Sequence, residues 1–148
     1  MSEATIRAQI KSILQGVTGI GAVYDYIRQT RSDAERLFLY TSGGKVNAIE
    51  FERKSNPNER DTNGTARRTY IYHFRGYYSL DDANQSSNQF QALIDAIFEA
   101  FKNNITLNGT ALLSDLIQFD EIDYSAIGGT LYHFVTGTFT IYDRSMTP

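Results

Sequence analysis

Two long stretches of the chain are rich in aromatic and β-branched residues and have the character of β-strands. One runs from Arg67 to Tyr78 and the other from Thr130 to Asp143. Successive side chains of a strand point to opposite faces of its sheet, so strands of this length need a partner layer on at least one face. The chain has 148 residues, which is enough for one domain with its own core. We therefore predict a single domain over residues 1–148, built around these two strands.

Two further segments have the spacing of amphipathic helices. Apolar residues recur at helical spacing from Ile6 to Val17, and Gly16 is expected to end this helix. The second segment follows a possible cap formed by Ser79 and Asp82. Its wide apolar stripe consists of Phe90, Leu93, Ile94, Ile97, Phe98 and Phe101. These patterns predict two main helices that pack on the sheet.

Shorter elements complete the predicted order. Ser32 and Glu35 have the spacing of a capping box, which predicts a brief helix over residues 33–41. Strands are expected over residues 45–54 and 116–124. The polar segment 55–66 contains Pro57 and an Asn-Gly pair, and it is expected to be an exposed hairpin loop. The order α-β-(α)-β-β-α-β-β predicts an α+β fold, with a mainly antiparallel sheet and the two main helices packed on one face.

The only two histidines, His73 and His133, each lie in a Tyr-His-Phe tripeptide on one of the long strands. His73 shares its strand face with Ile71 and Tyr77, whereas His133 shares its face with Val135 and Phe139. If each strand buries its more apolar face, the two histidines lie on opposite sides of the sheet, unless a bulge at a strand glycine reverses the pattern. Two histidines would also be an incomplete zinc site. Ordinary strand histidines are therefore favoured over a metal site.

Other chemical sites have weak signatures in this sequence. Glu52 and Lys54 form the E-x-K pattern of a magnesium-dependent nuclease, whose partner aspartate would have to be Asp25 or Asp33. The acidic cluster Asp120, Glu121 and Asp123 lacks the spacing of a calcium loop and is expected to be a solvated strand edge. No G-x-S-x-G motif is present. We expect neither a cofactor nor an enzymatic activity, and the nuclease stays open as a less favoured alternative.

Composition narrows the classes of partner. The formal net charge is −3 with interspersed signs, and there is no cysteine, which excludes disulfides and thiolate sites. The aromatic residues could stack on single-stranded nucleic acid, but the chain has only one small basic cluster. No apolar run is long enough for a membrane span, and the charged N-terminus does not resemble a signal peptide. We expect a soluble cytoplasmic protein without specific nucleic-acid or membrane binding.

Three segments of the chain have the character of motifs. The first is Gly19-Ile20-Gly21 with the following Val23-Tyr24-Asp25-Tyr26. The second is Arg75-Gly76-Tyr77 before the main helix. The third is the closing stretch "GGTLYHFVTGTFTIYDR". These segments resemble the tail-terminator, or tail-completion, proteins of long-tailed bacteriophages and prophages, including the lambda-like minor tail terminators. With the initial helix, the similarity extends over nearly the whole chain.

The resemblance implies a structural role in the virion. Such proteins form a homo-oligomeric ring, commonly a hexamer, on the head-proximal end of the tail tube. The ring ends tube polymerisation and prepares head joining, so its partners would be further copies of the chain, the major tail tube protein and the head-tail connector proteins. The chain would assemble in the bacterial cytoplasm and remain in the tail. Another connector or neck component is the nearest alternative.

On this interpretation the hairpin is the expected contact surface. Its loop is long and polar, and basic residues lie at its base. We expect it to reach a neighbouring subunit or the tail tube. The candidate interface residues are Arg53, Lys54, Asn58, Glu59, Arg60, Arg67 and Arg68.

Overall fold

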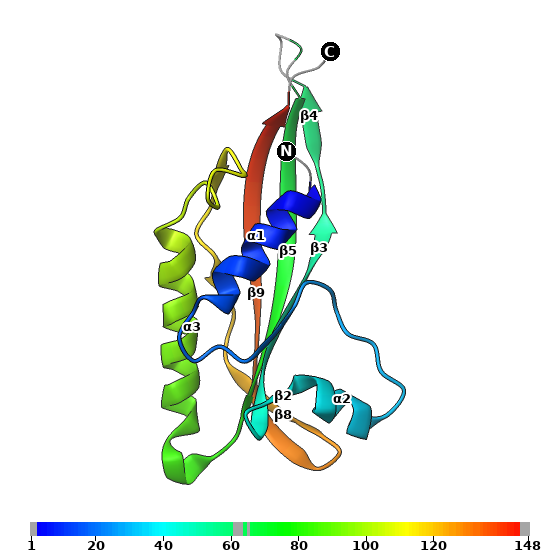
Figure 1. Cartoon of the computed structure of the whole chain (residues 1–148), viewed down its shortest axis with the longest axis vertical. Helices are drawn as coiled ribbons and strands as arrows, with labels where there is room; N and C mark the ends of the chain where they lie inside the picture. Colours follow the sequence, from blue (N-terminus) through cyan, green and yellow to red (C-terminus); the bar gives the residue numbers. More distant parts are fainter. Residues whose placement is uncertain (1–2, 61–63, 65, 146–148) are drawn as a thin grey trace.

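The computed structural model has one twisted sheet at its centre, and it describes residues 3–60, 64 and 66–145. The longest strands are β5 (Ala66–Ser79) and β9 (Thr130–Ser145), which pair antiparallel and extend along most of the molecule (Figure 1). On the other side of β5 lies β3 (Lys45–Ser55), also antiparallel. The sheet order is β1-β3-β5-β9-β6, so the mainly antiparallel α+β fold predicted from the sequence is confirmed.

Short strands occupy the two edges of the sheet. β1 (Ala22–Tyr24) pairs in parallel with β3. β2 (Thr41–Ser42) pairs antiparallel with β3, and β4 (Asn58–Arg60) pairs antiparallel with β5. Along the opposite edge, β9 carries β6 (Leu113–Ser114), β7 (Gln118–Phe119) and β8 (Asp123–Ile127).

The two main helices, α1 (Glu3–Gln15) and α3 (Ser86–Lys102), cover the same face of the sheet, which we call the helix face (Figure 1). Ile6, Ile10 and Leu14 of α1 are fully buried at helical spacing, as the sequence predicted. They pack with the stripe of α3 on strand residues that include Phe51 and Phe74. Burial of these side chains is the main stabilising contribution to the fold.

The short helix α2 (Asp33–Tyr40) packs on the opposite face, over one end of the sheet only. Ser32 caps it as predicted, because its Oγ accepts a hydrogen bond of 3.2 Å from the backbone N–H of Glu35. Tyr40 then packs on Tyr77 of β5, with the two rings stacked 4.4 Å apart. Toward the other end of the sheet this face has no helix over it among the described residues, and we call that part the open face.

The predicted cap of α3 by Ser79 and Asp82 is wrong. Residues Asp82–Asn84 form a 3-10 turn, and Gln85 then adopts a left-handed conformation with φ of 56°. Because this conformation interrupts the helical backbone, α3 begins only at Ser86. Ser86 fixes the junction by accepting a hydrogen bond of 2.8 Å from the backbone N–H of Asp81.

Two predicted boundaries also differ in the structure. The strand expected over residues 116–124 is replaced by β7 and β8, because Ile117 turns into the core and the pairing with β9 is interrupted between the two strands. The predicted hairpin loop over residues 55–66 is shorter, since β4 pairs with β5 within it. Residues 61–63 and 65 of that loop lie outside the described residues.

The backbone conformation after α1 explains why glycine occurs at positions 19 and 21. Gly19 adopts a φ of +87°, which favours glycine, and its carbonyl accepts a hydrogen bond of 3.0 Å from the Asn47 side chain. Gly21 lies against β3 so closely that a Cβ atom there would be 1.9 Å from the Asn47 carbonyl oxygen. These glycines therefore let the chain turn and dock β1 on the edge of β3.

Candidate assembly surface

The structure brings the predicted interface residues together at one edge of the sheet. The β3–β4–β5 region extends beyond the part of β3 that pairs with β1, at the upper end of the molecule in Figure 1. Asn58 lies opposite Arg68, and Glu59 lies opposite Arg67. We call the cationic side chains of this region the basic edge. They are Arg53, Lys54, Arg60, Arg67 and Arg68.

Most of these side chains make weak contacts within the chain. Lys54 Nζ lies 2.9 Å from Glu52 Oε1, and Arg67 lies 3.8 Å from Glu59. Both ion pairs lie at the surface, with Glu52 half-buried, and surface pairs contribute about 0–1 kcal/mol. Arg68 donates a hydrogen bond of 3.5 Å to the Tyr70 hydroxyl. These surface ion pairs can therefore be exchanged for contacts with another molecule at little cost.

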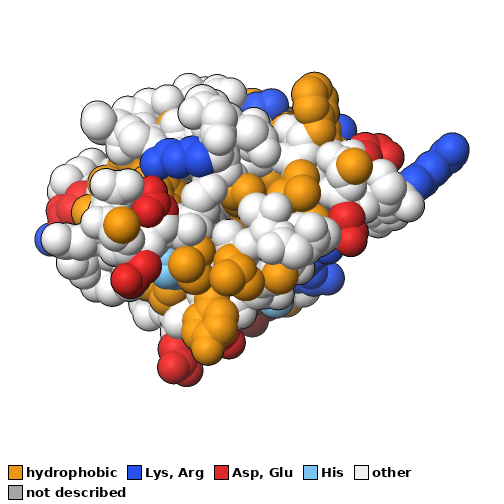
Figure 2. All heavy atoms as spheres, turned by 90° about the horizontal axis from the view of Figure 1, so that it is seen from below, with side chains coloured by type: hydrophobic (Ala, Val, Ile, Leu, Met, Phe, Trp, Pro, Cys, Tyr) orange, Lys and Arg blue, Asp and Glu red, His pale blue; other side chains and the backbone are white. Residues whose placement is uncertain are grey.

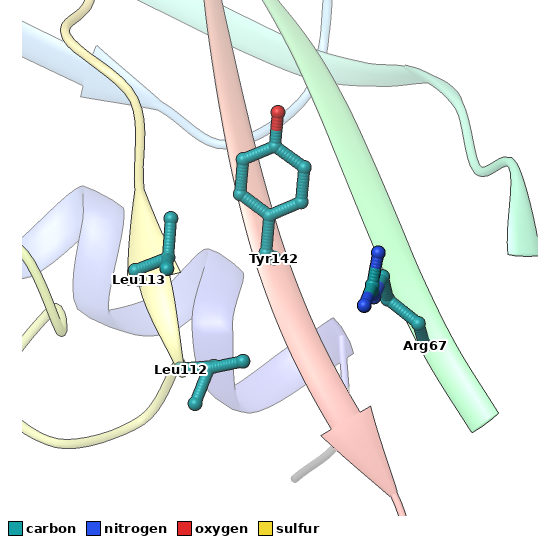
Figure 3. A pocket seen from close by; sticks show the side chains of 4 residues that line it. All are labelled: Arg67, Leu112, Leu113 and Tyr142. Atoms are coloured by element: carbon teal, nitrogen blue, oxygen red, sulfur yellow. The ribbon is translucent and has the colours of Figure 1, made fainter. Parts of the chain in front are cut away.

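The described residues contain a pocket of about 250 Å³ that extends from Arg67 of the basic edge across β9 to the β6 side of the sheet, and the sequence did not predict it. Its walls are Arg67 of β5, Tyr142 of β9, and Leu112 and Leu113 at β6 (Figure 3). Tyr142 donates a hydrogen bond of 2.9 Å to Asp115, and this bond raises the pKa of the Tyr142 hydroxyl. The pocket is shallow and mainly apolar on the leucine side, so it is a surface for contact with another macromolecule more than a catalytic cavity.

The open face continues from this pocket along the sheet. Its β9 residues are Thr136, Thr138 and Thr140, and across the ladder from Thr138 lies the exposed His73. A hollow of about 270 Å³ lies over Thr136, Thr138 and His73, beside Lys54 and Arg75. Threonine, histidine and charged groups can remain solvated in the free chain and can also make hydrogen bonds to a partner.

The structure confirms that the two histidines lie on opposite faces. The β5–β9 register runs without a shift from Ala66–Ser145 to Ser79–Tyr132, so no bulge at a strand glycine reverses the alternation. His133 lies on the helix face, 2.8 Å from Ser86 Oγ and stacked on Phe90. Burial lowers the pKa of His133, which favours the neutral ring in this contact. The two rings cannot share a ligand.

The structure separates the residues of the nuclease alternative. Asp25 lies 3.9 Å from Arg7 of α1, on the helix face. Asp33 begins α2, and Glu52 pairs with Lys54 on the open face. Within the described part of the chain, no group of three or more His, Asp or Glu side chains has an arrangement that could hold a metal ion.

Glu50 is a buried carboxylate that the sequence reading missed. It is fully buried between α2 and the sheet, where it accepts hydrogen bonds from the Tyr77 hydroxyl at 2.7 Å and the Tyr40 hydroxyl at 2.8 Å. The backbone N–H of Arg28 donates a third bond of 3.1 Å. The cluster joins α2, the β1–α2 loop and two strands, so it positions the elements beside the open face. Its only signal in the sequence is a polar residue within an apolar strand.

The tyrosines of this cluster predict a loss of stability at high pH. Burial, with a smaller contribution from Glu50, raises the pKa of Tyr40 from its ordinary value of 10 to about 12. Because the folded pKa is the higher one, this stabilisation is complete below pH 10 and is lost as the pH rises through about 12. Chemical denaturation at several pH values should show this fall in the free energy of unfolding. In the Tyr40→Phe variant the free energy of unfolding should fall less over the same pH range. Equal losses in both proteins would contradict the assignment.

A second exposed surface lies at the end of the molecule that carries α2 and the β8–β9 hairpin. Apolar side chains gather on this end when it is viewed from below (Figure 2). Phe38 of α2 is 80% exposed, and Tyr124 of β8 is 71% exposed. Large exposed aromatic side chains are frequent in protein interfaces.

No helix within the described residues is long and apolar enough to cross a membrane. Comparison of the sequence with models of known protein families and with curated proteins finds no match.

Proposed function

We propose that this chain is a structural protein of a long-tailed phage or prophage, and that it forms a ring on the head-proximal end of the tail tube. The ring ends tube polymerisation and prepares the tail for head joining. Its partners are further copies of the chain, the major tail tube protein and the head-tail connector proteins.

The observation that carries the proposal is the extent of sheet surface that no other part of the described residues covers. The basic edge, the open face and the apolar pocket are continuous, and they lie beyond the part of the sheet that α2 covers. A ring needs two different contact patches on each subunit, and a third surface to meet the tube. The long sheet supplies such surfaces without a cofactor.

The segments that resemble tail terminators also lie at constrained positions of this fold. Gly19 and Gly21 fit β1 against β3. Gly76 lies beneath α3, where an added Cβ would be 3.1 Å from Val135. The resemblance therefore involves residues on which the packing depends, which supports its use in the proposal.

Removal of the gene from the phage or prophage that carries it tests the function. Electron microscopy of the lysate should show tail tubes longer than the normal length, without heads, and a plasmid copy should restore normal tails. Tails of normal length that fail to join heads would instead indicate a connector. Infectious particles of normal form would show that the proposal is wrong.

Shortening the hairpin should separate folding from assembly. Replacement of residues 56–65 by a two-residue turn removes β4, whose residues are all exposed, so the free energy of unfolding should change by less than about 1 kcal/mol. The same variant should fail to restore normal tails in the gene-removal experiment. Pro57→Ala is the matched control, because it keeps the hairpin length and the carbonyl that accepts from the Thr69 N–H. Normal tails with the shortened hairpin would exclude a role for the loop.

A further inference from the structure

Acidic and basic residues are segregated between distant parts of the chain. From Asn103 to Asp143 there is no lysine or arginine. The exposed acidic residues of this segment are Asp115, Asp120, Glu121 and Asp123, which we call the acidic edge. The segment from Arg53 to Arg68, by contrast, contains five lysines and arginines and only two acidic residues, Glu59 and Asp61.

The fold places these two groups on opposite edges of one sheet. The acidic edge belongs to the segment of β6, β7 and β8, which pairs only with β9 among the described strands. The basic edge belongs to the ends of β3 and β5 and to β4, and in this region the described part of β3 pairs only with β5. Figure 1 shows the two edges on opposite sides of the β5–β9 pair. Each edge presents backbone N–H and C=O groups as well as charged side chains.

The acidic edge also carries exposed apolar side chains at its β6 end. Leu112, Leu113 and Leu116 are 48%, 41% and 51% exposed, in the same segment as the acidic residues. Protein interfaces commonly combine apolar side chains with charged groups at their margin. The aliphatic parts of lysine and arginine side chains can cover such leucines while their charged ends meet carboxylates.

We propose that the acidic edge of one copy of this chain docks on the basic edge of a second copy. The contact joins two different patches, so repetition of it adds copies head to tail until rotation closes a ring. The opposite charges of the two edges fix the choice of partner and its orientation, because like edges repel each other. This inference rests on the proposed ring and identifies the surfaces that form it.

Charge reversal on each edge tests the contact in the full chain. Asp120→Lys with Glu121→Lys and Asp123→Lys leaves only Asp115 against three lysines, so both edges of that chain are basic. Arg53→Glu with Arg67→Glu and Arg68→Glu leaves only Lys54 and Arg60 against a majority of acidic residues, so both edges of that chain are acidic. Sedimentation velocity at low salt should show that the unchanged chain self-associates, and that each reversed chain associates at least about tenfold more weakly. An equimolar mixture of the two reversed chains should associate again, because every contact then pairs opposite edges. Higher salt should weaken association in the unchanged chain and in the mixture.

A matched control changes the same amount of charge elsewhere. Asp82→Lys with Asp95→Lys and Glu99→Lys alters exposed residues of α3 and of the turn before it, and should leave association unchanged. Circular dichroism should show that all variants are folded. A monomeric unchanged chain, normal association of either reversed chain, or failure of the mixture to associate would overturn the inference. If the acidic-edge variant associates normally but leaves tails overlong, this edge contacts a different protein. The gene-removal experiment tests the capping function separately. Overlong tails in that experiment would support capping even if the contact between the two edges were wrong.

Discussion

Gly21→Ala is expected to lower the free energy of unfolding by about 3 kcal/mol, which is a large fraction of the stability of a domain of this size. The added Cβ would lie 1.9 Å from the carbonyl oxygen of Asn47 and 2.6 Å from its carbonyl carbon. Both atoms belong to the backbone of β3, so no side-chain rotation can relieve the overlap. The β1 segment would have to move away from the sheet edge, and Val23 would lose its contacts in the core.

Gly16→Ala is the matched control for this substitution. A Cβ at Gly16 would be 3.5 Å from its nearest atom, the carbonyl oxygen of Ile13, which is an ordinary contact. We expect this variant to change stability by less than about 1 kcal/mol. Urea denaturation followed by circular dichroism measures both values. Equal stability of the two variants would show that β1 does not need the close approach to β3.

Glu50→Ala is expected to destabilise the chain by a similar amount, about 3 kcal/mol. The substitution leaves the buried hydroxyls of Tyr40 and Tyr77 and the backbone N–H of Arg28 without their common acceptor. It also opens a cavity between α2 and the sheet, and cavities add to the cost of lost hydrogen bonds. Hydrogen exchange should show that α2 becomes less protected, whereas α1 and α3 on the other face change less.

Glu52→Ala is the control, because Glu52 lies two residues along the same strand and pairs with Lys54 at the surface. Its removal should cost less than about 1 kcal/mol. The destabilisation caused by Glu50→Gln should lie between those of Glu50→Ala and Glu52→Ala, because the amide oxygen can accept a hydrogen bond but the amide nitrogen cannot. If Glu50→Ala and Glu52→Ala were equally stable, the buried cluster would not be what holds α2 on the sheet.

The elements that the sequence predicted well are those with a strong period. The strands around His73 and His133 alternate over long stretches, so the face of each side chain followed from its position along the strand. The apolar spacing of α1 and α3 placed both helices on one face in the same way. Strong periodicity reflects burial, and burial determines the packing of these elements.

Other features depend on contacts between residues that are distant in the sequence. The spacing of Ser32 and Glu35 predicted α2 but not the face on which it packs, because that face depends on Glu50 and Tyr77. The start of α3 was misplaced because the left-handed Gln85 has no sequence signature. The short strands beside β9 form through pairing with that strand, so local propensity could not define them.

The candidate surface was also predicted only in part. The polarity of the hairpin and its basic residues indicated an exposed edge, and the structure places these residues together. The pocket beside it combines Leu112 and Leu113 with Tyr142 and Arg67, which are distant in the chain, so it could not be seen from the sequence. The acidic residues from Asp120 to Asp123 had been interpreted as a solvated edge. Their position opposite the basic edge became evident only from the order of the strands.

The location of the chain on the tail tests the central claim most directly. A gold-labelled copy can be incorporated into tails in a mutant that makes no heads, and the isolated tails can then be imaged by electron microscopy. A terminator should place the label at one end of each tail, opposite the tip that contacts the host. Label along the length of the tube, at the host-contacting tip, or absent from the tails would contradict the proposal that this chain caps the tube.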